Sequence, residues 1–166
     1  FAFVVFMPLY MAKYGMTDGQ WASIWGTIFL MNIIFNLVFG IVGDKIGWNK
    51  TVVWFGGVGC AVTVLLFYYS PQILNSYWFI LLCGALWCIM LAGYVPLSAL
   101  VPSLVKTDKG AAVSVLNLGA GLAAFVGPAL VRLLEKPIGY AGIAWVLAAL
   151  YIISAVMTHF IRPSEN

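Results

Sequence analysis

Charged side chains are scarce in this sequence. They make up 8% of the 166 residues, whereas 64% are hydrophobic and the mean hydropathy is +1.05. A soluble domain has about a quarter of its residues charged, because its surface must be hydrated. This chain has too few polar groups to cover such a surface, so its exterior must face lipid. The composition predicts an integral membrane protein with the lipid bilayer as a partner.

Other absences exclude whole classes of site. The net charge is only +3 and the cations are spread over loops, which excludes a nucleic-acid surface. The three cysteines show no pairing pattern or metal-ligand spacing. There is no metalloprotease helix, serine elbow or phosphate loop, and the loop carboxylates Asp44 and Asp108 have no catalytic partner in the sequence. We therefore expect no enzyme activity, no metal and no cofactor.

The sequence does contain a series of long apolar runs. A bilayer core of about 30 Å needs about 20 helical residues, and open strands are excluded in lipid because their edges would stay unpaired. One short and five full helical spans are predicted within a single domain, residues 1–166: 1–14, 18–43, 51–70, 77–102, 110–134 and 138–161. Thr17 and Gln20 have the spacing of a capping box before the second span, and Thr107 or Asp108 is expected to cap the fifth.

Basic residues are divided unequally between the two ends of these spans. One end carries five and the other carries three: Lys45, Lys50, Lys106, Lys109 and Arg162 against Lys13, Arg132 and Lys136. By the positive-inside rule, this excess places loop 43–50 and the C-terminus in the cytoplasm.

Polar residues within the spans show which helix faces avoid lipid, because a polar group in hydrocarbon is costly. They recur at steps of three and four, so that each set forms one helical face. The residues that we expect to face inward and to contact a ligand are Asn32 and Asn36 on the second span, Trp87 and Tyr94 on the fourth, and Asn117 on the fifth. The third and sixth spans have no buried amide.

Two interpretations stay open for any single asparagine. The amides either hydrogen-bond between helices or line a wet cavity, where amide groups and flat aromatic faces suit a neutral polyhydroxylated ligand. For the set we favour the cavity, because amides and aromatics gather on certain spans and are absent from others. No Asp, Glu, Lys or Arg lies in mid-span, so this segment contains no proton or sodium relay.

The stretch GIVGDKIGWNK, residues 40–50, separates the second span from the third. It resembles the loop motif of the major facilitator superfamily of transporters, Gly-x-x-x-Asp-Lys/Arg-x-Gly-x-x-Lys/Arg. The matching residues are Gly40, Asp44, Lys45, Gly47 and Lys50. The fit is incomplete, because Trp48 and Asn49 stand where the family often has a basic or small residue.

A second stretch, GAGLAAFVGP, contains Gly121, Gly127 and Pro128. It resembles the glycine–proline kink that these transporters carry in a helix at the contact between their two halves. The stretches WFGGVGCAVT, AGYVPLSALVPSL and KGAAVSVLNLGAGLAAFVGPALV resemble the C-terminal half of bacterial sugar-alcohol permeases of the ribitol and arabinitol type.

The resemblance covers the whole chain and implies an all-α fold, the C-terminal six-helix half of a twelve-helix bundle with its first helix truncated. It implies a secondary active transporter that moves a polyol or sugar across the bacterial inner membrane by alternating access, coupled to protons, with the N-terminal half as partner. The absence of intramembrane cations agrees with a neutral solute. In this family the first, second, fourth and fifth helices of each half face the cavity or the other half, and the third and sixth face lipid.

The same resemblance implies a role for the loop. Asp44 would meet the positive N-terminus of a helix from the other half when the inner gate is closed, which stabilises by about 0.3–1 kcal/mol. Lys45 and Lys50 would pair with Asp44 or with lipid phosphates. In the simpler alternative, Asp44 caps its own loop and the lysines only follow the positive-inside rule.

Two other functions fit the sequence. The first is that of a non-transporting membrane module, an assembly or sensor subunit that binds a partner through its glycine-rich faces. The second is that of a half-transporter that works as a homodimer. The coding sequence upstream of Phe1 separates these from an ordinary transporter, which has six further spans there.

Overall fold

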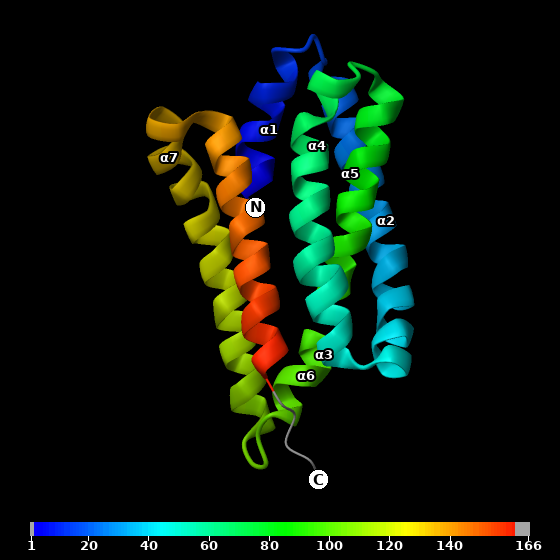
Figure 1. Cartoon of the computed structure of the whole chain (residues 1–166), viewed down its shortest axis with the longest axis vertical. Coiled ribbons are helices and arrows are strands. Elements are labelled where there is room, and N and C mark those ends of the chain that lie inside the picture. The colour runs from blue at the N-terminus through cyan, green and yellow to red at the C-terminus, as the bar shows by residue number, and fades with distance from the viewer. Residues whose placement is uncertain (1, 162–166) are drawn as a thin grey trace.

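The computed structural model describes residues 2–161 as a bundle of helices joined by short turns (Figure 1). The elements are α1 (Ala2–Ala12), α2 (Asp18–Ile46), α3 (Trp48–Thr51), the π-helix η1 (Val52–Gly59), α4 (Cys60–Ile73), α5 (Tyr77–Leu91), the 3₁₀-helix η2 (Ala92–Tyr94), α6 (Leu97–Ser103) and α7 (Lys109–Phe160). No strand occurs between residues 2 and 161, which confirms the all-α fold class. Phe1, where the first predicted span begins, and Arg162, counted for the orientation, lie outside the described residues.

The long apolar helices are assembled from several of these elements. α3, η1 and α4 are continuous from Trp48 to Ile73, and α5, η2 and α6 run from Tyr77 to Ser103. α7 contains the fifth and sixth predicted spans, because Gly139 (φ 66°, ψ −177°) interrupts its helical backbone. Glycine adopts this positive φ without steric cost. The chain reverses there, so that α7 consists of a first leg, 109–138, and a second leg, 140–160, that lie side by side (Figure 1).

The two predicted helix caps had different outcomes. The capping box is confirmed, since the backbone N–H of Gln20 donates to Thr17 Oγ1 (3.3 Å) and that of Thr17 donates to Gln20 Oε1 (3.0 Å). The side-chain cap predicted for the fifth span is wrong. Asp108 occupies the N-cap position of α7, but its backbone is left-handed (φ 58°) and no side chain caps the helix. An N-cap side chain reaches the first free N–H groups from an extended backbone.

The core of the bundle forms around α1. Phe3, Phe6, Met7 and Met11 are at most 2% exposed and belong to one cluster with residues of α2, α4, α5 and α7. Phe3 stacks on Phe67 of α4, with ring centroids 5.9 Å apart. The short first helix is therefore held by aromatic packing from several neighbours.

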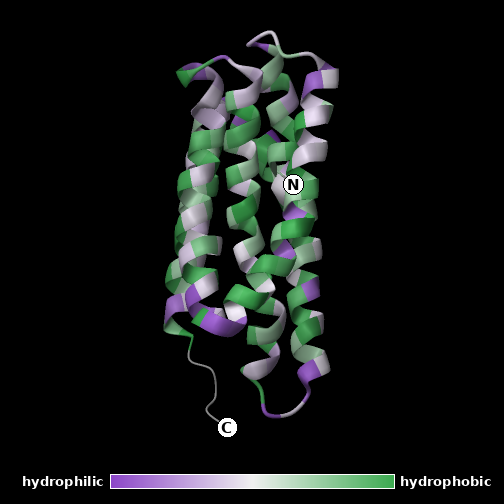
Figure 2. Cartoon of the chain, turned by 90° about the vertical axis from the view of Figure 1, so that its right-hand side faces the viewer, coloured by the Kyte–Doolittle hydropathy of each residue, from purple (hydrophilic) through white to green (hydrophobic). Residues whose placement is uncertain are grey.

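The long helices differ strongly in how much they are enclosed. In the third span 56% of the apolar window is buried, against 17% in α2. Most of the hydrophilic residues lie towards the two ends of the bundle, and hydrophobic residues predominate along its length (Figure 2). α2 and the first leg of α7 thus have long apolar faces that are not covered by other helices of this chain.

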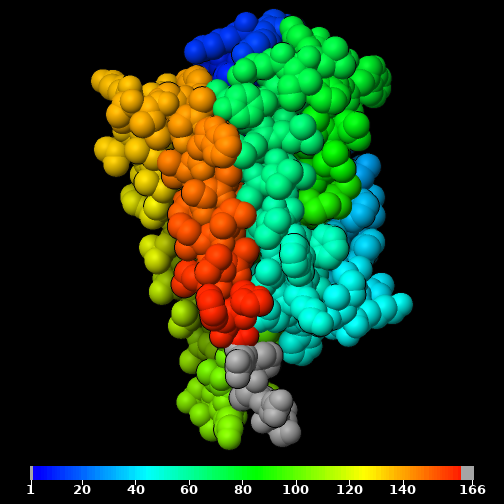
Figure 3. All heavy atoms as spheres, viewed as in Figure 1, coloured from blue at the N-terminus to red at the C-terminus, as the bar shows by residue number. Residues whose placement is uncertain are grey.

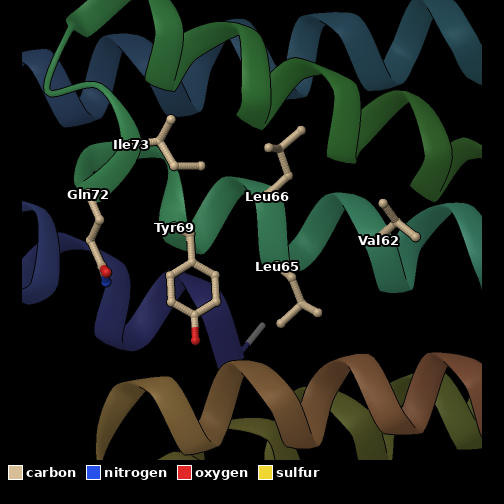
Figure 4. A pocket seen from close by; sticks show the side chains of 6 residues that line it. All are labelled: Val62, Leu65, Leu66, Tyr69, Gln72 and Ile73. Atoms are coloured by element: carbon tan, nitrogen blue, oxygen red, sulfur yellow. The ribbon is translucent and has the colours of Figure 1, made fainter.

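The third span has a packed side and an open side. It packs against α5 and against the second leg of α7, which runs beside α4 in the space-filling view (Figure 3). Its open side carries a groove of about 550 Å³, lined by Val62, Leu65, Leu66, Tyr69, Gln72 and Ile73 (Figure 4). This groove is the part of the third span that suits the lipid-facing position implied by the resemblance.

Glycines allow the third span to approach its neighbours closely. A Cβ atom on Gly93 of η2 would lie 2.6 Å from the backbone nitrogen of Gly56 in η1. A Cβ atom on Gly57 would lie 2.9 Å from the Cα atom of Ala155 in the second leg of α7. Small residues permit such backbone contacts between helices in membranes.

Candidate functional site

A chain of amide groups links α2 to α5. Asn36 Nδ2 donates to Asn32 Oδ1 (3.2 Å), one helical turn earlier on the same face of α2. Asn32 Nδ2 in turn donates to the backbone carbonyl oxygen of Cys88 in α5 (3.3 Å). Both asparagines are partly buried. Asn32 thus bridges two helices, while the side-chain oxygen of Asn36 accepts no hydrogen bond within the described residues.

A small hollow lies beside this chain of amides. Its volume is about 150 Å³, and it is lined by Val4, Trp25, Ile28, Phe29, Asn32, Trp87, Cys88 and Leu91. These residues come from α1, α2 and α5, so the first, second and fourth predicted spans meet there. The lining combines aromatic rings with one amide and has no charged group.

Trp87 lines the hollow and is only 6% exposed. Three rings lie nearly parallel to its own, those of Phe3 (centroids 5.2 Å apart), Phe67 (6.0 Å) and Trp25 (6.4 Å). Its buried indole N–H has no hydrogen-bond acceptor among the described residues. The Tyr151 hydroxyl is near enough to interact with this N–H, but the geometry does not complete a hydrogen bond.

The other two predicted ligand residues lie elsewhere. The Tyr94 ring packs on Gly56, where an added Cβ would be 3.1 Å away, and its hydroxyl donates to Ser154 Oγ (3.3 Å). Tyr94 therefore faces the third span and the second leg of α7. Asn117 is exposed on the first leg of α7 and makes no side-chain hydrogen bond within the described residues. Neither residue lines the hollow.

The loop motif forms a tight turn at the end of the bundle where α2 meets α3. Gly47 has φ 108°, a backbone conformation that favours glycine. Asp44 accepts a hydrogen bond from Trp48 Nε1 (2.9 Å), whereas neither Lys45 nor Lys50 pairs with it among the described residues. Gly40 has open space where its Cβ would be. Asp44 is thus bonded to Trp48, one of the two residues that depart from the family's loop motif.

The stretch predicted to carry a glycine–proline kink lies on the first leg of α7. Gly121 has open space around its Cα, whereas a Cβ on Gly127 would lie 3.2 Å from the backbone nitrogen of Ala2. Gly127 therefore packs the first leg of α7 against the start of α1. The backbone stays helical through Pro128, and the departure from helical dihedrals comes at Gly139.

The predicted set of contact residues did not include several residues that line the hollow. Trp25 and Phe29 lie on the same helical stripe as Asn32, so the spacing of the aromatics was a usable signal for both. The acceptor carbonyl of Cys88 gives no such signal, because a backbone group is present at every position.

The hollow and the loop motif lie in a bundle with helices long and apolar enough to cross a membrane. The chain belongs to the Major Facilitator Superfamily, whose family model matches residues 1–166. Similar proteins are the alpha-ketoglutarate permease of Bacillus subtilis (strain 168), 51% identical, and the putative transporter YoaB of the same organism, 53% identical. The D-arabinitol transporter of Klebsiella pneumoniae is 37% identical.

These relatives are longer than this chain. The matches cover 100% of this chain and 38% of the alpha-ketoglutarate permease, 100% and 40% for YoaB, and 99% and 39% for the D-arabinitol transporter. The chain therefore spans about two fifths of the length of the curated relatives it matches. No solved structure matches the chain. The resemblance to the major facilitator superfamily and to its sugar-alcohol permeases is confirmed.

Proposed function

We propose that this chain is the C-terminal six-helix half of a secondary transporter that moves a small, oxygen-rich solute across the bacterial inner membrane by alternating access. The N-terminal half of the same protein is its partner, and the loop motif and C-terminus lie in the cytoplasm. Family membership and relatives that are transporters or permeases support the transport function.

The observation that carries this proposal is the amide chain beside the aromatic hollow. Asn32 and Cys88 hold α2 against α5, and Asn36 keeps an unused side-chain oxygen next to them. Intramembrane polar groups of this kind mark solute pathways as well as helix contacts. In major facilitator transporters the solute lies near the midplane between the two halves, so the hollow would form this half's share of the site.

The leading solute class is a neutral polyol or sugar. The hollow contains an amide and aromatic rings and has no cation in its lining, which suits hydroxyl groups. A similar D-arabinitol transporter supports this class. The contact residues that we propose remain Asn32, Asn36, Trp87, Tyr94 and Asn117. Asn32 and Trp87 line the hollow, and Asn36 is bonded to Asn32.

A dicarboxylate is the second candidate. The alpha-ketoglutarate permease is 51% identical to this chain, against 37% for the D-arabinitol transporter. A dianion needs cationic or strongly donating groups around its carboxylates. Because the hollow has no cation, a dicarboxylate transporter must supply those groups from the other half.

Uptake of radiolabelled solutes by the full-length protein in cells separates the two candidates. We expect saturable uptake of ribitol, arabinitol or xylitol that alpha-ketoglutarate does not inhibit. Uptake of alpha-ketoglutarate alone would replace the polyol by the dicarboxylate. If protein shown to be in the membrane takes up none of these, the proposed solute classes are both wrong.

The same assay tests the coupling to protons. Asp, Glu, Lys and Arg are absent from mid-span positions of this chain, so the coupling carboxylate is proposed to lie in the other half. A proton uncoupler should then abolish accumulation of the solute. Accumulation that persists with the uncoupler would contradict proton coupling.

A further inference from the structure

Asn49 joins two parts of the chain that are more than a hundred positions apart in sequence. Its Nδ2 donates to the backbone carbonyl oxygen of Thr158 (2.7 Å) and to that of Ile161 (2.8 Å). Thr158 and Ile161 form the C-terminal end of α7, where Ile161 is the C-cap residue. The loop motif is thus bonded directly to the end of the last helix.

The chemistry of this contact is that of a helix cap. The last carbonyl groups of a helix have no N–H partner within the helix. The amide of Asn49 donates to two carbonyl groups at this end of α7. One belongs to the buried residue Thr158 and also accepts from the backbone N–H of Ile161 (3.1 Å), and the other belongs to the C-cap residue Ile161. A small side chain at this position would not reach these carbonyl groups.

The rest of the loop is also fixed. Asp44 is bonded to Trp48, and the hydroxyl of Thr51 donates to the carbonyl oxygen of Gly47 (2.9 Å). A Cβ on Gly43 would lie 2.6 Å from Cγ of Pro96, which precedes α6. Contacts therefore connect the turn to α2, to the fourth span and to the end of α7.

We infer that Asn49 is a positioning residue that fastens the end of α7 to the loop motif, so that the two stay together throughout the transport cycle. Figure 1 shows this end of α7, in red, beside α3 and α6. The loop would then move only together with the last span. The inference goes beyond the proposed function, and it rests on that function only for its transport readouts.

Hydrogen exchange of the full-length protein tests the fastening without any transport assay. Asn49→Asp removes both donors and adds a negative charge at the negative end of a helix dipole. We expect the backbone amides of residues 156–161 to exchange several-fold faster in this variant. Unchanged exchange in a folded variant would overturn the inference.

Asn75→Asp is the matched control. Asn75 Nδ2 donates to the carbonyl oxygen of Tyr14 (3.0 Å) at the opposite end of the bundle. The same chemical change there should leave exchange at residues 156–161 as in the wild type. An equal increase in both variants would show general loosening and would contradict a specific fastening by Asn49.

Crosslinking tests whether the contact persists during transport. In Asn49→Cys/Ile161→Cys, a short cleavable thiol crosslinker should join the two positions, and uptake after crosslinking should be at least as fast as in the same variant before crosslinking. The native cysteines Cys60, Cys83 and Cys88 are buried, and the two single-cysteine variants control for modification alone. Uptake that is blocked by crosslinking and restored by cleavage would show that the contact must open, which overturns the inference.

Kinetics separate positioning from a merely structural role. Asn49→Asp should lower the maximal uptake rate several-fold and leave KM for the solute within about twofold, because Asn49 does not line the hollow. A maximal rate equal to that of the wild type despite faster exchange would reduce Asn49 to a structural cap. If the full-length protein transports nothing, the proposed function fails, and hydrogen exchange still decides whether Asn49 fastens the helix.

Discussion

At the scale of single residues, the two asparagines of α2 differ in how much of their hydrogen-bonding capacity is already used. Asn32 donates to the Cys88 carbonyl and accepts from Asn36, so its amide is engaged in both directions. Asn36 only donates, and its oxygen is unused. The sequence left open whether each asparagine joins helices or contacts a solute. Asn32 mainly joins two helices, and Asn36 is the better candidate for a contact with the solute.

Alanine substitutions should separate these roles. Asn36→Ala should raise KM for the solute several-fold and hardly change the thermal unfolding of the purified protein. Asn32→Ala should lower stability by about 0.6–2 kcal/mol, the range for hydrogen bonds between membrane helices. Transport kinetics and thermal unfolding of the full-length variants provide the measurement. Unchanged kinetics in Asn36→Ala would remove this residue from the site.

Two glycines of the loop motif form another residue-scale test. Gly47 and Gly40 both have open space where a Cβ would be, but only Gly47 has a positive φ (108°). Gly47→Ala should therefore destabilise the protein by about 1–3 kcal/mol through backbone strain alone. Gly40→Ala, in a helical backbone, should be neutral or slightly stabilising. Equal unfolding temperatures for the two variants would contradict this explanation of Gly47.

At the scale of elements, the third span depends on glycines where it meets its neighbours. η1 approaches the second leg of α7 at Gly57 and Ala155, and it approaches η2 at Gly56 and Gly93. These contacts put the irregular helices η1 and η2 next to each other. A side chain at Gly57 or Gly93 must displace a backbone, because the nearest atoms there are main-chain or Cβ atoms. A Cβ on Gly56 would instead meet the ring of Tyr94 at 3.1 Å.

Gly57→Ala tests this packing. Its Cβ would overlap with Ala155, so the second leg of α7 must shift, and we expect a loss of about 1–3 kcal/mol, as for other overpacked sites. Gly26→Ala is the control, because Gly26 on α2 has open space. Thermal unfolding in one detergent compares the two variants. A Gly57→Ala protein as stable as Gly26→Ala would contradict this expectation, because it would show that the second leg of α7 shifts with no loss of stability.

At the scale of the whole molecule, the fold could be predicted from the sequence because lipid leaves few choices. A chain with 8% charged residues and runs of about 20 apolar residues must form helices to satisfy its backbone. The capping box at Thr17 was also predictable, since both partners are three residues apart. Such features depend on composition or on local spacing.

The contacts between distant segments could not be predicted in this way. Asn49 donates to carbonyl groups 109 and 112 positions away in the sequence, and Asn32 donates to one 56 positions away. Every residue has a backbone carbonyl group, so the sequence does not indicate which of them will accept a bond. The packing of the bundle determines which carbonyl lies within reach. The side-chain cap predicted at Thr107 or Asp108 was wrong for a local reason, because the left-handed backbone of Asp108 is not visible in the residue type.

The measurement that tests the central claim most directly is solute protection of a cysteine placed at Asn36 in the full-length protein. Asn36→Cys should react with a membrane-impermeant thiol reagent, and a saturating concentration of the transported solute should slow this reaction several-fold. Leu37→Cys is the control, because Leu37 is 74% exposed and its apolar side chain takes no part in the hydrogen bonds that join Asn36, Asn32 and Cys88. A reaction at Asn36→Cys that proceeds at the same rate with and without solute would contradict a solute site between α2 and α5.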